Sequence, residues 1–265
     1  MSGVIKLSSP ATHGFWEIPV LFEDAHLLAL DKPSGLPTSP YQDDTQLPSL
    51  MKLLHTAIAD GKPWAKERGL EYLNDTNLLE RDTTGVLLLA KNKEAFIKIA
   101  DWFGAENPGK QFLALVHGSP VTERFDVNAK LGSQPDRPGF VRVDPENGKK
   151  SKSSFEVVER FADFTLLKCI ALTDRPHQLR VHLQNSGLRV VGDELYGGDP
   201  LLLSKLKRDF YLKRGKVERP LISNPALHCE RLTLPHPVSG ETVTITAPMP
   251  KDFVVALKYL RLYSA

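Results

Sequence analysis

The segment that most constrains this chain runs from Asn77 to Asn92, where charged and turn-forming residues lead directly into an apolar run. Its first half, NLLERDTTG, carries two carboxylates, Glu80 and Asp82, and its second half begins with the apolar run VLLLA. A short run without polar alternation is typical of a strand that is buried on both faces. The segment therefore predicts two carboxylates at the start of a buried strand, where they can act as nucleophile, general base or turn acceptor.

Hydrophobic periodicity predicts further elements on both sides of this segment. We expect strands at residues 16–22, 27–31, 86–91, 112–117, 153–161, 164–172 and 242–247, and helices at 47–59, 93–103, 177–186 and 253–263. Residues 1–15 carry no clear pattern and are expected to form a loosely ordered N-terminal extension. Adjacent strands with helices inserted irregularly favour an α+β fold with a mixed sheet.

The bulk properties exclude some classes of protein. No run of 18 apolar residues is present, so we expect no membrane span, and the N-terminal residues lack the pattern of a secretory signal. The two cysteines, Cys169 and Cys229, lie in apolar patterns and are expected to be reduced core residues. These features favour a cytoplasmic protein.

Positive charge is concentrated in one segment, although the formal net charge is only +2. Phe210 and Tyr211 are interleaved with the cations of this segment, which are Lys205, Lys207, Arg208, Lys213, Arg214, Lys216 and Arg219. Such a patch suits a phosphate backbone. The alternative is a solvated surface loop or helix without a ligand.

A second polar cluster lies between Thr173 and Gly197. The predicted helix places His177 and Arg180 one turn apart on a shared face, where the arginine could hold a carboxylate by paired hydrogen bonds. His177 and His182 are five residues apart, which is poor spacing for two zinc ligands on one helix. We therefore expect no metal here, and we interpret His182 as a partly buried polar residue.

These segments together resemble the RluA-type RNA pseudouridine synthases. The family motif H-R-L-D-x-x-T-S-G is similar to residues 77–85, and G-R-T-H-Q-I-R-x-H-L is similar to residues 174–183, where Asp174 and Pro176 replace Gly and Thr. The motif ending G-D-x-x-Y-G is similar to residues 192–197, K-P-A-G-L to residues 32–36, and K-x-Y-x-A-x-V-x-G to residues 110–118. The resemblance extends from about Trp16 to Phe253.

The resemblance implies an α+β fold whose mixed, largely antiparallel sheet is split by a cleft and flanked by helices. It implies one catalytic domain over residues 16–265, without a separate S4-type RNA-binding domain. The reaction would convert a uridine of structured RNA, rRNA or tRNA, into pseudouridine after the base is flipped out of its stack. No cofactor and no metal would be needed, and we expect a monomer that binds RNA.

Three of the family's site residues fall on positions where this chain departs from the motif, whereas Arg180 is kept. Glu80 takes the place of the nucleophilic Asp, Arg180 would pair with that carboxylate, and Phe112 would stack on the target base in place of Tyr. Leu78 stands where an Arg that invades the RNA helix is common, although an apolar wedge can also unstack bases. Further substrate contacts are expected from Arg81, Asp82, Arg175, His177, Gln178, Lys205, Lys207, Arg208, Lys213 and Arg214.

Two interpretations of Glu80 stay open at this point. Glu has one methylene more than Asp, and a displacement of roughly 1 Å can reduce a rate about a hundredfold. The chain is then either a working uridine isomerase with a longer acidic side chain or a catalytically inactive RNA-binding protein on the same scaffold.

Overall fold

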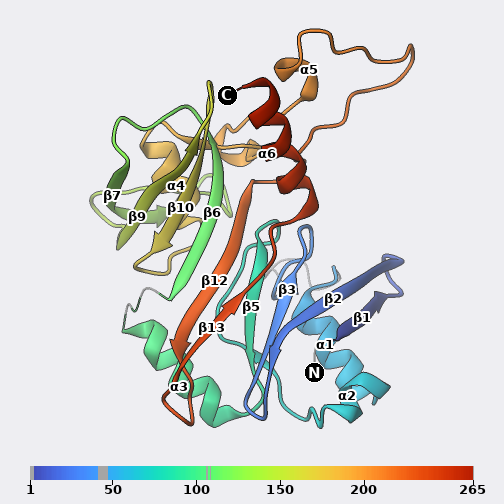
Figure 1. The fold of residues 1–265 in the computed structure, drawn as a ribbon. Helices are drawn as coiled ribbons and strands as arrows, with labels where there is room; N and C mark the ends of the chain where they lie inside the picture. Colours follow the sequence, from blue (N-terminus) through green and yellow to red (C-terminus); the bar gives the residue numbers. More distant parts are fainter. Residues whose placement is uncertain (1–2, 41–46, 106, 108, 265) are drawn as a thin grey trace. The chain divides into compact units, whose positions relative to one another are not determined.

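The computed structural model describes residues 3–40, 47–105, 107 and 109–264, which divide into two compact units (Figure 1). Unit 1 comprises Met1–Gly109 and Cys229–Pro248, and unit 2 comprises Lys110–His228 and Met249–Ala265. Each unit combines helices with antiparallel strand ladders, which confirms the predicted α+β class. Within the described residues, no helix combines the length and apolar character needed to cross a membrane.

Unit 1 is built on a sheet in the order β1-β2-β3-β5-β12, with β4 beside β5 and β13 beside β12. Its strands are β1 (Val4–Ser9), β2 (Gly14–Glu23), β3 (Leu27–Lys32), β4 (Asn74–Asp75), β5 (Thr84–Ala90), β12 (Leu227–Pro235) and β13 (Thr242–Thr246). Its helices are α1 (Leu50–Ala59), α2 (Pro63–Glu67) and α3 (Lys93–Gly104).

The N-terminal residues form a hairpin, so the expected loose order of residues 1–15 is wrong. Strand β1 pairs with β2 along its whole length, from Val4 opposite Pro19 to Ser9 opposite Gly14. Ile5 and Leu7 are buried, and β1 packs against α1. The alternation of buried and exposed residues spans only six positions, which is too short to stand out in the sequence.

Strand β5 lies at the centre of unit 1. Every residue from Gly85 to Ala90 is buried, and β5 pairs antiparallel with β3 in a register that places Lys32 opposite Gly85. Gly85 has φ +106°, and a Cβ atom at this position would lie 2.1 Å from the carbonyl oxygen of Cys229. Only glycine therefore allows β12 to approach the start of β5 this closely.

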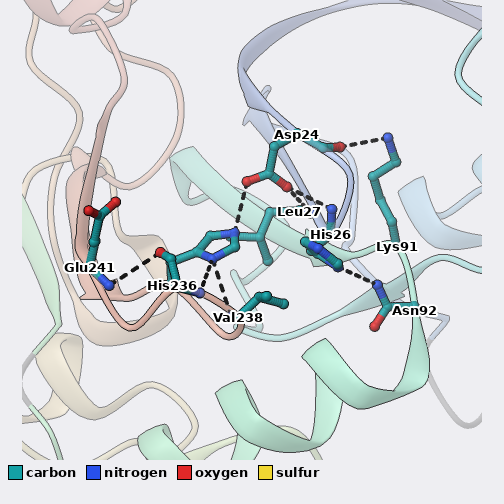
Figure 2. A network of polar contacts seen from close by, with 9 residues as sticks. Asp24, His26, Leu27, Lys91, Asn92, His236, Val238 and Glu241 are labelled. Carbon is teal, nitrogen blue, oxygen red and sulfur yellow. Dashed lines mark hydrogen bonds and ion pairs between the residues drawn. The ribbon is translucent and has the colours of Figure 1, made fainter.

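A polar network holds the β12–β13 connection against the β2–β3 turn in unit 1 (Figure 2). The imidazole of His236 hydrogen-bonds the Asp24 carboxylate through Nε2 at 2.9 Å, and its Nδ1 accepts the backbone N–H groups of Val238 and Ser239. The other carboxylate oxygen of Asp24 accepts the backbone N–H groups of the β2–β3 turn. Two segments more than 200 residues apart in sequence are joined in this way.

Unit 2 contains the sheet β6-β10-β9-β7-β8, with β11 beside β6. Its strands are β6 (Lys110–His117), β7 (Arg124–Ser133), β8 (Val141–Val143), β9 (Lys149–Arg160), β10 (Phe164–Ala171) and β11 (Arg189–Val190). Its helices are α4 (Gln178–Asn185), the short 3-10 helix η1 (Glu194–Tyr196), α5 (Leu203–Leu206) and α6 (Lys251–Tyr263).

Helix α4 packs against β7, β8, β9 and β10, as Figure 1 shows. His182 is fully buried in this contact, which confirms its interpretation as a structural polar residue and places it deeper than expected. The Ser151 hydroxyl donates to the Ala129 carbonyl oxygen, so Ser151 Oγ accepts from His182 Nε2–H at 2.8 Å. His182 Nδ1 then accepts from the Ser153 hydroxyl at 2.9 Å, and both ring nitrogens are satisfied in the neutral form.

Substitution of Gly85 by alanine should lower the free energy of unfolding by about 3 kcal/mol or more, because it adds both backbone strain and a steric clash with β12. Urea-induced unfolding measures this loss. Gly104→Ala is the matched control, since Gly104 ends α3 with open space around its Cα and should cost nothing. Equal stability of the two variants would contradict the close approach of β12 and β5.

Burial lowers the pKa of His182 from 6.5 to about 4. A base whose pKa falls on folding stabilises the protein fully above its unfolded pKa, so this stabilisation is lost as the pH falls from about 6.5 through 4. His182→Gln should therefore flatten the pH dependence of the free energy of unfolding in that window by about 1 to 3 kcal/mol. His13→Asn, which removes an exposed histidine, should leave the slope unchanged, and a slope that both variants share would refute the assignment.

Candidate active site

The loop from Asn77 to Thr84, which precedes β5 in unit 1, is fixed by side chains at its beginning. The Asn77 amide is buried, donating to the Val86 carbonyl oxygen at 3.1 Å and accepting from the Leu88 N–H at 2.7 Å. The buried Thr38 hydroxyl donates to the Leu79 carbonyl oxygen at 2.7 Å. Asn77, which stands where the family motif has His, therefore holds the loop against the strand that follows it.

A buried lysine holds the second half of the same loop. The Lys32 ammonium donates to the carbonyl oxygens of Pro33, Arg81 and Thr83 at 2.9, 2.8 and 2.9 Å. Three donors meet three acceptors, which is the full capacity of an ammonium group. Burial lowers the pKa of Lys32 to about 7, and the negative charges of Asp82 and Glu80 oppose this shift. The two carboxylates of the loop thus lie within electrostatic range of a buried cation.

Four of the predicted site residues lie on this loop. Glu80 opens a tight turn in which the Thr83 N–H donates to the Glu80 carbonyl oxygen at 3.2 Å, and its side chain is half-buried. Leu78 is 58% exposed and Arg81 is exposed, with Arg81 Nε donating to the Gly35 carbonyl oxygen. Asp82 is half-buried. The structure thus gathers Leu78, Glu80, Arg81 and Asp82 on one surface turn at the start of β5.

A second group of site residues surrounds the start of α4 in unit 2. His177 caps the helix in the left-handed conformation, with φ +54°, which non-glycine residues adopt at a cost. Its Nδ1 lies 2.7 Å from the hydroxyl of Tyr196, and its ring meets the Tyr196 ring edge-on. The guanidinium of Arg180 lies 4.8 Å above the same ring. The expectation that His177 and Arg180 share a helix face is confirmed by this common neighbour.

The orientation of Arg180 is fixed by a buried ion pair. Arg180 Nε and Nη2 donate to the two carboxylate oxygens of Asp193 at 2.7 and 2.6 Å, and the two residues are 8% and 1% exposed. Such paired contacts are short and directional. Asp193 lies in a tight turn beside Gly198. A Cβ atom at position 198 would lie 1.8 Å from the Val190 carbonyl oxygen, so this turn requires glycine there.

Gln178 and Arg175 both form hydrogen bonds within the protein. Gln178 is buried; its amide oxygen accepts from the Thr173 hydroxyl, and its amide nitrogen donates to the Lys152 carbonyl oxygen and to Ser153 Oγ. These contacts favour a positioning role beneath α4 over the direct RNA contact predicted for Gln178. Arg175 is half-buried and donates to the Lys150 carbonyl oxygen at 3.2 Å.

Phe112 and the residues of the basic segment lie elsewhere in unit 2. Phe112 is only 7% exposed on β6, opposite Cys169, so its stacking on a base stays a prediction. Two residues earlier, the buried Lys110 pairs with Asp174 at 2.6 Å. Asp174 stands where the family motif has Gly, and it links β6 to the segment that leads into α4.

The basic segment, Lys205–Arg219, begins in the last residues of the short helix α5 and continues as an irregular loop; the whole segment is called the basic loop. The loop is closed at its base by a bridge between Leu201 and Ile222 and by a hydrogen bond from Leu221 N–H to the Leu201 carbonyl oxygen. Tyr211 is 81% exposed among the cations. All five basic residues predicted to bind substrate lie on this loop, and these are Lys205, Lys207, Arg208, Lys213 and Arg214.

The predicted site residues thus form one group in unit 1 and two in unit 2. Glu80 and Arg180 belong to different units, and their pairing stays a prediction. Lys32 and Asp193 carry no predicted role although both lie in family-like motifs. In the parts of the chain that the structure describes, no cluster of three or more His, Cys, Asp or Glu residues is arranged to hold a metal ion.

Replacement of Lys32 by methionine should lower the free energy of unfolding by about 2 to 4 kcal/mol, because buried carbonyl oxygens then lose their only charged donor. The comparison is Lys6→Met, which removes a lysine from an ion pair whose members are 66% and 55% exposed and should change stability by less than about 0.5 kcal/mol. Denaturant titration measures both. A Lys32→Met protein as stable as wild type would show that the loop does not depend on this cation.

The chain was compared with known proteins. Residues 26–185 match the family model described as RNA pseudouridylate synthase. A ribosomal large subunit pseudouridine synthase D from Nitrosomonas europaea is 32% identical over 247 residues, covering 92% of this chain and 65% of the relative, so this chain spans just under two thirds of that protein. A ribosomal large subunit pseudouridine synthase C from Escherichia coli K12 is 33% identical over 244 residues, covering 91% and 70%.

A solved structure shows the same fold. Human RNA pseudouridylate synthase domain containing 4 matches with a TM-score of 0.72 and 22% sequence identity, covering 91% of this chain and 92% of that one. The family match spans more than half of the chain and includes the Asn77–Thr84 loop and α4. The chain therefore belongs to the RNA pseudouridylate synthase family.

Proposed function

We propose that this chain isomerises a uridine of RNA to pseudouridine, with Glu80 as the attacking carboxylate and Arg180 as the cation that orients it. The observation that carries the proposal is the fixed presentation of both groups. The buried Thr38 hydroxyl holds the backbone just before Glu80, and the buried Lys32 ammonium holds the backbone after it. A buried carboxylate holds the guanidinium of Arg180. Such preorganisation is what catalysis by positioned charges requires.

The reaction needs only groups of the chain and the RNA itself. The Glu80 carboxylate attacks the nucleoside, and the glycosidic bond between ribose and N1 of uracil breaks. The uracil turns over, and C5 forms a new carbon–carbon bond with the ribose while the bond between the ribose and Glu80 breaks, which regenerates the carboxylate. C5 loses its proton and N1 gains one, so substrate and product have the same composition. A carboxylate that forms a covalent intermediate divides one difficult step into two easier ones.

The Asp193 ion pair supports the role of Arg180. A guanidinium carries five N–H donors on two edges, and Asp193 uses the edge formed by Nε and Nη2. We assign Glu80 as a second acidic partner of the same guanidinium, because Arg180 stands at the position of the family arginine that pairs with the catalytic carboxylate. Glu has one more methylene than Asp, so its carboxylate extends further from the same backbone position. The position of the Arg180 guanidinium would then determine where the Glu80 carboxylate lies.

The substrate class is RNA, and we assign it to ribosomal RNA because the relatives of known name act on the large ribosomal subunit. An enzyme that modifies a base must first extrude it from the stack. The exposed Leu78 provides an apolar wedge for that step, and the exposed Tyr211 and the cations of the basic loop provide stacking and phosphate contacts.

The decisive test concerns Glu80. Unmodified transcripts of large-subunit rRNA and of tRNA are incubated with wild-type protein, and pseudouridine is mapped chemically. Wild type should form pseudouridine, whereas Glu80→Gln, which keeps the size and removes the charge, should reduce the rate at least about a thousandfold. Glu71→Gln, an exposed position in the same unit, should match wild type.

Two further outcomes separate the alternatives. Asp82→Asn should retain most of the activity, and a loss as large as that of Glu80→Gln would move the nucleophile to Asp82. A silent wild type combined with an active Glu80→Asp variant would show instead that the natural chain is a catalytically inactive RNA-binding protein.

A further inference from the structure

Strands β7, β8 and β9 bring four cations to one face of the unit 2 sheet. The antiparallel register places Lys130 opposite Lys150, Asn128 opposite Lys152, and Arg142 opposite Gly132. Residues that lie directly opposite each other on paired strands project from the same face. Lys130, Arg142, Lys150 and Lys152 therefore share one face, which we call the cationic face.

The burial pattern shows that this face points away from α4. Ser151 and Ser153, which alternate with the lysines of β9, are buried and hydrogen-bond His182 of α4. Leu131, next to Lys130, is buried in a cluster with Val181 of α4. Lys150, Lys152 and Arg142 are exposed, and Lys130 is half-buried. The inner face of the sheet thus forms core, and the outer face presents its cations to the solvent.

Among the described residues, the four cations of this face are not held in ion pairs, although one acid shares the face: Asp144 Oδ2 lies 3.1 Å from the position that a Cβ on Gly132 would take. In the described chain no carboxylate forms an ion pair with Lys130, Arg142, Lys150 or Lys152. Asp144, which follows β8, accepts the backbone N–H groups of Glu146 and Asn147 through one carboxylate oxygen. Like charges directly opposite each other destabilise a sheet. Repulsion between Lys130 and Lys150 therefore lowers the free energy of unfolding, and a bound anion would offset that repulsion.

The other end of the same face gives a contrast. There Arg124 pairs with Glu156 at 2.7 Å, and Lys168 pairs with the same carboxylate. Asp126, opposite Ser154, adds a further negative charge there. Protection of an exposed sheet edge by charged residues explains Arg142, because β8 is the last strand of the sheet. It does not explain the three lysines, since β7 and β9 lie inside the sheet.

We propose that the cationic face binds the phosphate backbone of the substrate RNA. Alternate residues of a strand lie about 6.8 Å apart and neighbouring strands about 4.8 Å apart, which produces a regular two-dimensional array of point charges. Such an array suits the repeating phosphates of an RNA strand and contacts no bases, so it adds affinity without sequence preference.

The proposal rests on the proposed function and adds a second RNA contact to it. Strand β9 leads directly toward the site residues of unit 2. The Leu172 N–H donates to the Lys152 carbonyl oxygen at 3.0 Å, and Arg175 donates to the Lys150 carbonyl oxygen. The segment between β10 and α4 therefore continues beside β9. Phosphates bound on the cationic face would hold RNA along β9, on the side of the sheet away from α4.

Neutralisation of the cationic face tests the proposal. A quadruple variant carries Lys130→Gln, Arg142→Gln, Lys150→Gln and Lys152→Gln, and the probe is a fluorescent RNA hairpin with a uridine in its loop. Dissociation constants are measured from about 50 to 300 mM KCl. The variant should bind at least about tenfold more weakly at low salt, and the slope of log K against log salt should fall by about 2 to 4.

The matched control is the double variant Arg124→Gln and Lys168→Gln. It removes cations from the same face, but these already pair with Glu156, so affinity should stay within about twofold of wild type. The thermal midpoint of the quadruple variant at low salt should equal or exceed that of wild type, because a repulsive pair is removed. This result separates a loss of RNA contacts from a loss of folding.

Several outcomes would overturn the proposal. Wild-type affinity and salt dependence in the quadruple variant would exclude the cationic face as an RNA surface. An equal loss of binding to polyglutamate would assign the face to an acidic protein partner. Pseudouridine formation on unmodified rRNA is measured in parallel at saturating protein. If wild type forms no pseudouridine while the quadruple variant binds RNA more weakly, the proposed reaction alone is refuted. If wild type forms pseudouridine while the quadruple variant binds RNA as tightly as wild type, the cationic face alone is refuted.

Discussion

The arrangement of the acidic loop depends on one buried ammonium group. Lys32 closes strand β3 and collects three carbonyl oxygens, two of which come from the turn that carries Glu80. The backbone of this turn is therefore fixed by the side chain of a residue about 50 positions earlier in the chain. A side chain at position 80 projects from a fixed backbone, so an additional methylene changes its reach and leaves the loop in place. The negative charges of Glu80 and Asp82 in turn stabilise the buried cation.

Much of the fold could be predicted from the sequence, because the central strands are apolar. Strands β3, β5, β6 and β10 carry runs of buried residues, and helices α1, α3 and α6 carry clear apolar stripes. Strand β7 was not among the expected strands although Phe125, Val127 and Leu131 alternate with polar residues, because its inner face is only partly buried and the alternation is not continued by an apolar run. The division into two units was also hidden, because unit 1 is completed by residues 229–248, far from its other strands in sequence.

The site was predictable as a set of motifs and not as a set of interactions. Glu80, His177 and Arg180 follow from motif positions, whereas their supports do not. Lys32 reaches the loop across 51 residues, and Asp193 reaches Arg180 across 13. For Gln178 the motif predicted a direct RNA contact. In the structure its amide forms hydrogen bonds inside the protein. Motif spacing identifies which residues matter, but hydrogen-bond partners depend on tertiary packing.

The closed base of the basic loop has an evolutionary consequence. Leu201 and Ile222 bring the two ends of the loop together, and the residues between them join no sheet of unit 2. Doubling the length of a flexible loop costs only about 0.6 kcal/mol when its ends are already adjacent. Insertions, deletions and changes of charge between these two residues can therefore accumulate while the ion pair at Arg180 is preserved. Divergence of target choice within such a family can proceed there without remodelling the chemistry.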